Sequence, residues 1–476
     1  MRTMTYFRAL VASAAVATAA CSSSSLNVGN PNSPNIAGAP NARAAVQLAV
    51  TGILAQARSN WLGWGTTTGS YGREYYLMQA QFGGVIFGPY RDWPLFNGNG
   101  AGLWSGYYTN LRNAQSLLTF LDTVPSANYS DQFKAGARGF ARTFYALELL
   151  YPILARDSIG AVTTMPADAI GLAPFVSRDS VYRFISNTLD QAQTDLQGAG
   201  GTFSFALTTG YSGFGVAATT PAGFILFNRA LKARVEAYRG SLGCGTPCYQ
   251  AALTALNASF FAPVGIATLS AANLQNGIWH LYSIASGDVP NNNAVGQNQF
   301  VYANPSIRDD GRIPGVTSDL RYVAKIRSAP SSTVEGVTSN IQLQVFRDGN
   351  SPAPIIRREE LVLLYAEAQY FTGNATEALN AINAIRTVSG GLTARGAFAD
   401  AADFRTELIN QRRLSLLFEG HRWVDTRRLL GYAGLPPIRF NEPAAYTVAT
   451  RLPVPQLECD ARRLNGDAAV RGPGCP

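Results

Sequence analysis

Histidine and long apolar runs are scarce in this chain, and each scarcity excludes a class of protein. Only His280 and His421 occur, which leaves few candidates for a Ser-His-Asp triad and gives little support to a zinc site. Beyond the first twenty residues, no apolar stretch approaches the roughly 18 residues of a membrane-spanning helix. The phosphate loop G-x-x-x-x-G-K-S/T and the zinc helix H-E-x-x-H are absent. We therefore expect no metal, no cofactor and no catalytic residues.

Lysine is nearly absent, and the positive charge of the chain comes from scattered arginines. The formal net charge is +8, and it falls to +6 if Arg2 and Arg8 are removed with a leader. No basic run exceeds two residues, so the electrostatic footprint of a nucleic-acid-binding protein is missing. A mild preference for anionic ligands is compatible with the balance, but we expect no nucleic-acid partner.

The first forty residues have the pattern of an exported, lipid-anchored protein. Residues 1–20 combine two arginines with an apolar run, which predicts a signal peptide. Thr18-Ala19-Ala20-Cys21 resembles a lipoprotein box, so we expect Cys21 to carry a lipid. Residues 21–40 are rich in Ser, Asn, Pro and Gly and predict a flexible tether. The alternative is plain secretion after Ala20 with an unmodified Cys21.

Cysteine usage agrees with export to an oxidising compartment. With Cys21 lipidated, an even number of cysteines remains, and four cysteines allow three pairings. Short loops close most readily, which favours Cys244–Cys248 and Cys459–Cys475.

Helical periodicity recurs along the chain, and at 47% hydrophobic residues there is ample material for a large core. The predicted helices are Asn41–Ser59, Leu103–Val124, Tyr129–Leu154, Arg178–Leu196 and Pro221–Leu242. Short joins between them predict a mainly α scaffold of helical pairs with long irregular loops. We expect a helical region over 41–260, a loop-rich variable region over 261–354 and a C-terminal region over 355–476.

The clearest predicted pair of helices lies within Arg358–Arg386. Ala366 and Ala378 lie twelve residues apart and would let two helices approach closely, while Gly373 suits the turn between them. This spacing resembles one tetratricopeptide unit. The alternative is a generic helical hairpin.

The segment Asp403–Arg428 predicts one amphipathic helix that ends in a cluster of charges. The cluster places oppositely charged residues three apart, from Glu419 through Arg422 and Asp425 to Arg428, so they are neighbours on a helix and we expect a ladder of ion pairs. We expect this helix to pack between other elements, with its arginines fixing their relative placement. The alternative is an ordinary amphipathic helix with surface ion pairs. Trp423 lies inside the ladder, and a Trp usually buries most of its ring.

This segment resembles the closing signature of the SusD/RagB family of nutrient-binding outer-membrane lipoproteins. The matching residues are Arg412, Arg413, Glu419, Gly420, Arg422, Trp423, Asp425 and Arg428. Gln411, Ser415 and Thr426 depart from the usual Glu, Glu and Leu. Other helices resemble those of the family in the same order, so that the resemblance covers most of residues 41–430.

Three stretches without clear periodicity are predicted to be irregular: Trp61–Gly102, Thr202–Thr220 and Phe260–Pro354. Loops of this length usually carry function, and the first and third are dense in aromatic residues, whose flat faces stack on sugar rings. On that density alone, the candidate ligand residues are Tyr75, Tyr76, Trp93, Asn97 and Trp279. The alternative is that these rings fill a core.

The resemblance implies a lipid-anchored protein at the cell outer membrane that captures nutrient oligomers and is not an enzyme. It also implies a partner, a SusC-like TonB-dependent barrel transporter, over which the protein acts as a lid. The ligand class stays open between a glycan oligomer and a peptide. Two other functions remain: a helical exported glycoside hydrolase, with acids such as Asp309-Asp310 or Glu359-Glu360, and a repeat scaffold that binds no ligand.

Overall fold

Helices dominate the part of the chain that the computed structural model describes, which confirms the mainly α prediction. The described residues are 42–78, 103–125, 129–166, 171–262, 264–297, 299–334, 336–431 and 449–463. Contacts divide the chain after Ala45, and the account below concerns the unit that begins at Val46. The predicted signal peptide, Cys21 and the tether lie outside the described residues. Within the described ranges, no helix combines the length and hydrophobicity needed to cross a bilayer.

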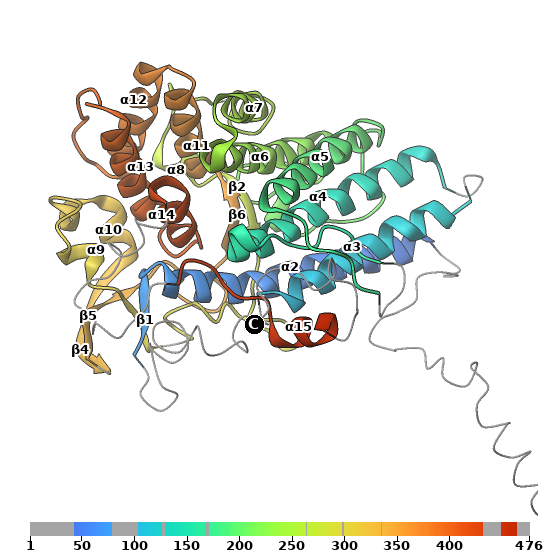
Figure 1. Ribbon diagram of the computed structural model, residues 1–476, viewed down its shortest axis with the longest axis horizontal. Coiled ribbons are helices and arrows are strands. Elements are labelled where there is room, and N and C mark those ends of the chain that lie inside the picture. The colour runs from blue at the N-terminus through green and yellow to red at the C-terminus, as the bar shows by residue number, and fades with distance from the viewer. Residues whose placement is uncertain are drawn as a thin grey trace, which may run out of the picture. The chain divides into compact units, whose positions relative to one another are not determined.

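Consecutive helices of the first half pack against each other from α3 to α7 (Figure 1). The helices are α2 (Ala42–Tyr71), α3 (Ser105–Thr123), α4 (Asp131–Arg156), α5 (Arg178–Gln197), α6 (Pro221–Arg239) and α7 (Thr246–Asn257). The predicted ranges agree with α3 to α6 to within a few residues. For α2 the prediction is wrong at its end, because the helix continues through Trp61–Tyr71, which we predicted to be irregular.

Side-chain caps and one glycine explain how these helices start and how closely they pack. Ser130, Ser177 and Thr220 cap α4, α5 and α6 by accepting a hydrogen bond from a backbone N–H three residues on. At Gly139 of α4, a Cβ would lie 2.5 Å from Leu196 Cγ of α5. Glycine therefore permits the close approach that buries most of α4 between its neighbours.

The second half contains the predicted pair, α11 and α12, which pack against each other. The elements are α11 (Arg358–Phe371), α12 (Ala375–Ala384), η9 (Ile385–Ser389), α13 (Ala401–Ser415), α14 (Arg422–Leu430) and α15 (Gln456–Arg463). Ala366 and Ala378 are fully buried. Gly373 has φ 93°, a conformation that favours glycine, so the turn forms where the sequence predicted it.

The prediction of one continuous helix over Asp403–Arg428 is wrong, because α13 and α14 are separate helices. Between them Phe418 (φ 61°) and Gly420 (φ 83°) adopt left-handed conformations. A Cβ at residue 420 would clash with the indole of Trp64. Phe418 packs against Tyr75 with ring centroids 5.0 Å apart. The apolar spacing continues past the end of the helix because the turn itself is buried.

Six strands form a four-stranded sheet of order β1-β3-β5-β4 and a two-stranded sheet of β2 and β6 within the described residues. Their bounds are β1 (Tyr75–Leu77), β2 (Gly277–His280), β3 (Val301–Ala303), β4 (Ile326–Val334), β5 (Val337–Leu343) and β6 (Ala353–Arg357). The stretch Phe260–Pro354 holds most of them, so its prediction as irregular is wrong at these positions.

Short helices complete the described chain, and in Figure 1 the four-stranded sheet lies beside α9 and α10. Their bounds are η5 (Asp157–Ile159), η6 (Thr209–Tyr211), η7 (Gly240–Cys244), α8 (Ala271–Leu274), α9 (Ser306–Asp309), η8 (Val316–Ser318) and α10 (Leu320–Lys325).

Candidate functional site

The signature residues of α13 and α14 form a buried network of ion pairs. Asp425 accepts hydrogen bonds from Arg412 Nε at 2.7 Å and from Arg428 Nε at 2.9 Å. Arg428 also binds both oxygens of Glu367 in α11, at 2.6 and 2.9 Å. Burial raises the pKa of Asp425, but the two guanidinium groups outweigh burial and lower it to about 2. The network therefore joins α11, α13 and α14 through buried ion pairs.

Of the predicted ladder only the Asp425–Arg428 pair forms, and it is buried rather than on the surface. The turn between α13 and α14 separates Glu419 from the helix that carries the other three residues. Glu419 accepts from Arg357 Nη2 at 2.7 Å instead. Arg422 Nε donates to the carbonyl oxygen of Gly72 at 3.1 Å, which ties the end of α2 to α14. Trp423 is fully buried, as predicted.

One signature residue connects α13 to the short helix α9. Arg413 Nη1 donates to Asp310 Oδ2 at 2.8 Å, and Arg413 Nη2 donates to Ser306 Oγ at 2.7 Å. The Arg413 side chain is 1% exposed, so these bonds are shielded from water. We call these three residues the Arg413 clamp. The clamp holds the first residue of α9 and the residue that follows its last.

A polar pocket of about 380 Å³, the sheet pocket, lies where α9 meets the hairpin of β4 and β5. Its lining offers hydroxyl, amide, carboxylate and guanidinium groups. The lining residues are Tyr76, Pro305, Arg308, Asp309, Ser331, Gly336, Val337, Thr338, Ser339 and Asn340.

Arg308 links the two walls of the sheet pocket. Its Nε donates to Asp309 Oδ1 at 2.6 Å, and its Nη2 donates to Asp309 Oδ2 at 2.9 Å and to Asn340 Oδ1 at 3.1 Å. The side chains of Arg308 and Asp309 are 30% and 37% exposed, so a ligand can reach both. Their opposite charges balance each other. Such a surface suits a neutral ligand with many hydroxyl groups, each of which can both donate and accept.

The structure separates the two predicted tyrosines of β1. Tyr76 lines the sheet pocket, although only 1% of it is exposed, so it forms part of the floor rather than an open stacking face. Tyr75 packs in the core against Phe418, as the core alternative expected, and it lines neither pocket described here. Trp93 and Asn97 lie outside the described residues.

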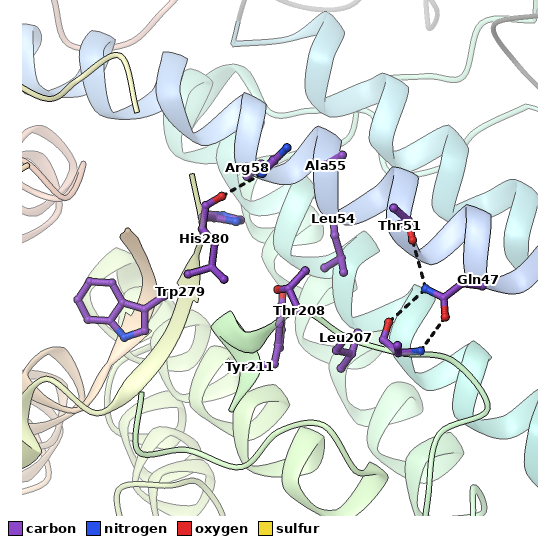
Figure 2. A pocket seen from close by; sticks show the side chains of 12 residues that line it. Gln47, Thr51, Leu54, Ala55, Arg58, Leu207, Thr208, Tyr211, Trp279 and His280 are labelled. Atoms are coloured by element: carbon purple, nitrogen blue, oxygen red, sulfur yellow. Dashed lines mark hydrogen bonds between the residues drawn. The ribbon is translucent and has the colours of Figure 1, made fainter. Parts of the chain in front are cut away.

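Trp279 of β2 lines a different pocket, which lies between α2 and η6 (Figure 2). Its indole stacks on Phe214 with ring centroids 5.1 Å apart, and Figure 2 shows it pointing away from the other lining side chains. Trp279 and Tyr76 are therefore not brought together. Sequence reasoning missed Arg308 and Asn340, because they lie 32 residues apart and no motif joins them.

The carboxylates considered for a glycoside hydrolase are bound by arginines. Asp310 belongs to the Arg413 clamp, and Glu360 accepts from Arg234 Nε and Nη2, both at 2.6 Å. Burial raises the pKa of Glu359, but the charge of Arg357 outweighs burial, and the pKa lies at about 2. A glycosidase acid needs a raised pKa and access to the substrate. Glu359 and Glu360 are buried, and arginines lower the pKa of both, so these two carboxylates have neither property. Asp310 is held in the Arg413 clamp, and Asp309 is paired with Arg308 in the sheet pocket.

Cys244 and Cys248 form a disulfide with their Cα atoms 5.8 Å apart. Cys459 is buried and disulfide-bonded, and Cys475, the partner predicted for it, lies outside the described residues. In the described ranges, no group of three or more His, Cys, Asp or Glu side chains is placed to hold a metal ion.

Comparison with known proteins finds a family match in the C-terminal part and a shared fold over most of the chain. The sequence model of the SusD family matches residues 334–453, which include α11 to α14 and the signature. No curated protein sequence matches the chain.

Solved structures extend the likeness. A SusD superfamily protein from Parabacteroides distasonis has a TM-score of 0.64 at 15% identity, over 88% of this chain and 98% of its own. Surface glycan-binding protein A from Bacteroides uniformis has a TM-score of 0.63 at 17% identity, over 90% and 99%. A laminarin-binding SusD-like protein has a TM-score of 0.58 at 16% identity, over 88% and 97%. At these identities the likeness establishes the fold.

Proposed function

This chain belongs to the SusD/RagB family, and from that premise we propose that it binds glycan oligomers and does not cleave them. The observation that carries the proposal is the connection between the family signature and the sheet pocket. The Arg413 clamp of α13 holds α9, and α9 presents Arg308 and Asp309 to the pocket. Two proteins of the same fold are named for binding laminarin and surface glycans.

The chemistry of the sheet pocket supports a neutral sugar as the ligand. Sugar hydroxyls can accept from the guanidinium of Arg308 and donate to the carboxylate of Asp309 or the amide oxygen of Asn340. A hydrogen bond to a charged group contributes about 1.5–3 kcal/mol. Trp93 and Asn97 belong to the chain segment after β1 and remain predicted ligand residues.

We also propose that the protein is held at the outer membrane by a lipid on Cys21 and acts as the lid of a SusC-like TonB-dependent transporter. The lipoprotein-box pattern at residues 18–21 and the family membership support this assignment. A tether of about twenty residues would hold lid and barrel at a high effective concentration even when the lid is open.

The ligand proposal is tested by calorimetric titration of neutral and acidic polysaccharides into the chain carrying Cys21→Ser, which needs no detergent. We expect at least one neutral polysaccharide to bind. Arg308→Ala should weaken its binding by about tenfold, which corresponds to about 1.4 kcal/mol. The matched control is Arg183→Ala, which removes an exposed arginine that also pairs with a nearby aspartate, Asp179, but on α5. The control should bind like the parent chain.

Three results would contradict the ligand proposal. If no polysaccharide binds while a stable protein complex is recovered, the scaffold alternative is correct. If the purified chain releases reducing ends from a glycan, the glycoside hydrolase alternative is correct. If Arg308→Ala and Arg183→Ala bind equally well, the ligand site is not the sheet pocket.

The partner proposal is tested by purification from detergent-solubilised outer membrane. We expect the native chain to bring a barrel protein with it, and the Cys21→Ser chain to leave the membrane fraction. Recovery of the native chain without a barrel protein would contradict the lid assignment while leaving the glycan proposal intact.

A further inference from the structure

The second pocket, the α2 pocket, has a volume of about 320 Å³ and lies between the middle of α2, the segment 206–211 and the segment 279–281 (Figure 2). It shares no lining residue with the sheet pocket. The proposed glycan function makes no use of it.

The body of the α2 pocket is apolar. Leu54, Leu207 and Leu281 come from three separate parts of the chain, and each is only half-buried. Figure 2 shows Leu54 pointing from α2 toward Leu207 and Thr208. Half-buried leucines that converge on one cavity leave apolar surface that a ligand can cover.

Side chains of α2 hold the walls of the pocket at both ends. At one end Gln47 forms two hydrogen bonds with the backbone of Ala206. Gln47 Nε2 donates to the carbonyl oxygen of Ala206 at 3.3 Å, and the backbone N–H of Ala206 donates to Gln47 Oε1 at 2.7 Å. At the other end Arg58 Nη1 donates to the carbonyl oxygen of Leu281 at 3.1 Å. Gly210 lets the segment 206–211 pack directly against the segment 279–281, since a Cβ at this position would clash with the carbonyl of Trp279. The pocket is therefore preformed.

Among the described residues that line this pocket, Arg58 alone carries a charge. Burial lowers the pKa of His280 to about 3, and the charge of Arg58 adds to the effect, so this imidazole is neutral. Arg58 Nη2 contacts Asp288, which does not line the pocket and has a side chain that is 34% exposed. A ligand anion can replace Asp288 on Arg58, because the displaced carboxylate returns to water from an already exposed position.

We propose that the α2 pocket binds a small amphipathic carboxylate, with its anionic head on Arg58 and its alkyl or aryl body against Leu54, Leu207 and Leu281. The one positive charge lies at the end of an apolar slot, and an amphipathic anion matches both features. A neutral glycan matches neither, so this ligand class is distinct from the cargo proposed for the sheet pocket.

The test uses three naphthalene probes of nearly equal size: 1-naphthoate, 1-naphthalenemethanol and 1-naphthylmethylammonium. Each is titrated calorimetrically into the purified chain carrying Cys21→Ser. We expect 1-naphthoate to bind with a Kd below about 1 mM, the neutral alcohol to bind several-fold more weakly and the cation not to bind. Arg58→Gln should reduce the affinity for 1-naphthoate to that of the alcohol.

A blocking variant locates the binding. Ala55 is exposed at the rim of the pocket, so Ala55→Trp fills the slot without disturbing the core and should abolish binding of 1-naphthoate. Thr208→Trp on the opposite wall serves the same purpose if Ala55→Trp does not fold. Arg308→Ala in the sheet pocket should leave the probe affinity unchanged.

Three results would overturn the proposal: no binding of 1-naphthoate at about 1 mM, equal affinity for all three probes, or full affinity in a folded blocking variant. The glycan proposal survives each of these results, because its own titrations concern the other pocket.

Discussion

Glu148 of α4 is a buried carboxyl whose ionisation we expect to destabilise the fold as the pH rises. It is 1% exposed, and its Oε2 accepts a hydrogen bond from Asn60 Nδ2 at 2.7 Å. Burial raises its pKa from 4.5 to about 8, although the hydrogen bonds from Asn60 and Asn110 act in the opposite direction. The side chain is therefore protonated in the folded protein at neutral pH.

The direction in which stability changes with pH follows from how many protons the folded and unfolded chains bind. Between pH 4.5 and about 8 the folded chain holds a proton on Glu148 that the unfolded chain has lost. Its contribution to stability is fully present below pH 4.5 and is lost as the pH rises through about 8. At about 1.36 kcal/mol for each pKa unit, the shift corresponds to about 5 kcal/mol. Glu148→Gln removes this pH dependence and keeps an oxygen that can accept from Asn60.

The assay is urea unfolding of the parent chain and of Glu148→Gln between about pH 5 and about pH 8. The difference in unfolding free energy should grow in favour of the variant by about 1.4 kcal/mol for each pH unit. The variant is compared with the parent chain at each pH because His280 and His421 make the stability of both chains depend on pH in the opposite direction. The pKa values of these two histidines are lowered in the folded protein. Asp179→Asn, at a 64% exposed side chain, is the control and should show a flat difference. A flat difference for Glu148→Gln would refute the reasoning.

Three further predictions concern the signature. Arg428→Met leaves Glu367 buried without its charged partner and should lower the unfolding free energy by about 3–5 kcal/mol in denaturant melts. Adding Glu367→Leu should recover most of this loss, and failure to recover it would contradict the pairing. Gly420→Ala adds a Cβ at positive φ against Trp64 and should cost more than about 1–3 kcal/mol; an unchanged thermal midpoint would rule out the steric argument. Arg413→Met releases α9 and should weaken glycan binding about tenfold in a chain that circular dichroism shows to be folded; parent-like affinity would remove its positioning role.

The helices of the first half could be predicted from the sequence because their causes are local. Ser130, Ser177 and Thr220 cap helices whose apolar spacing begins within a few residues, so pattern and cap agree. The turn at Gly373 was predictable for the same reason. The end of α2 was not, since the threonines and glycines before Tyr71 have low helix propensity and tertiary packing outweighs it.

The rest of the fold and most of the sheet pocket depend on contacts between distant residues. Tyr76 pairs with Tyr302 across β1 and β3, and no local sequence pattern predicts such a pairing. The break at Gly420 escaped prediction because buried residues continue the helical spacing through the turn. Arg308 and Asn340 become neighbours only when α9 packs on β5. One sequence alone does not indicate that these two residues lie close together in the folded chain.

The Arg413 clamp has a consequence for how ligand preference can diverge. It holds Ser306 and Asp310, and its hydrogen bonds do not involve Arg308 or Asp309, the two side chains between them that line the sheet pocket. Substitutions at these two positions therefore alter the recognition surface while the backbone beneath it keeps its anchorage. On the proposal that this pocket holds the glycan, exchanging Arg308 and Asp309 would change what a duplicated copy recognises and would leave the buried interior as it is.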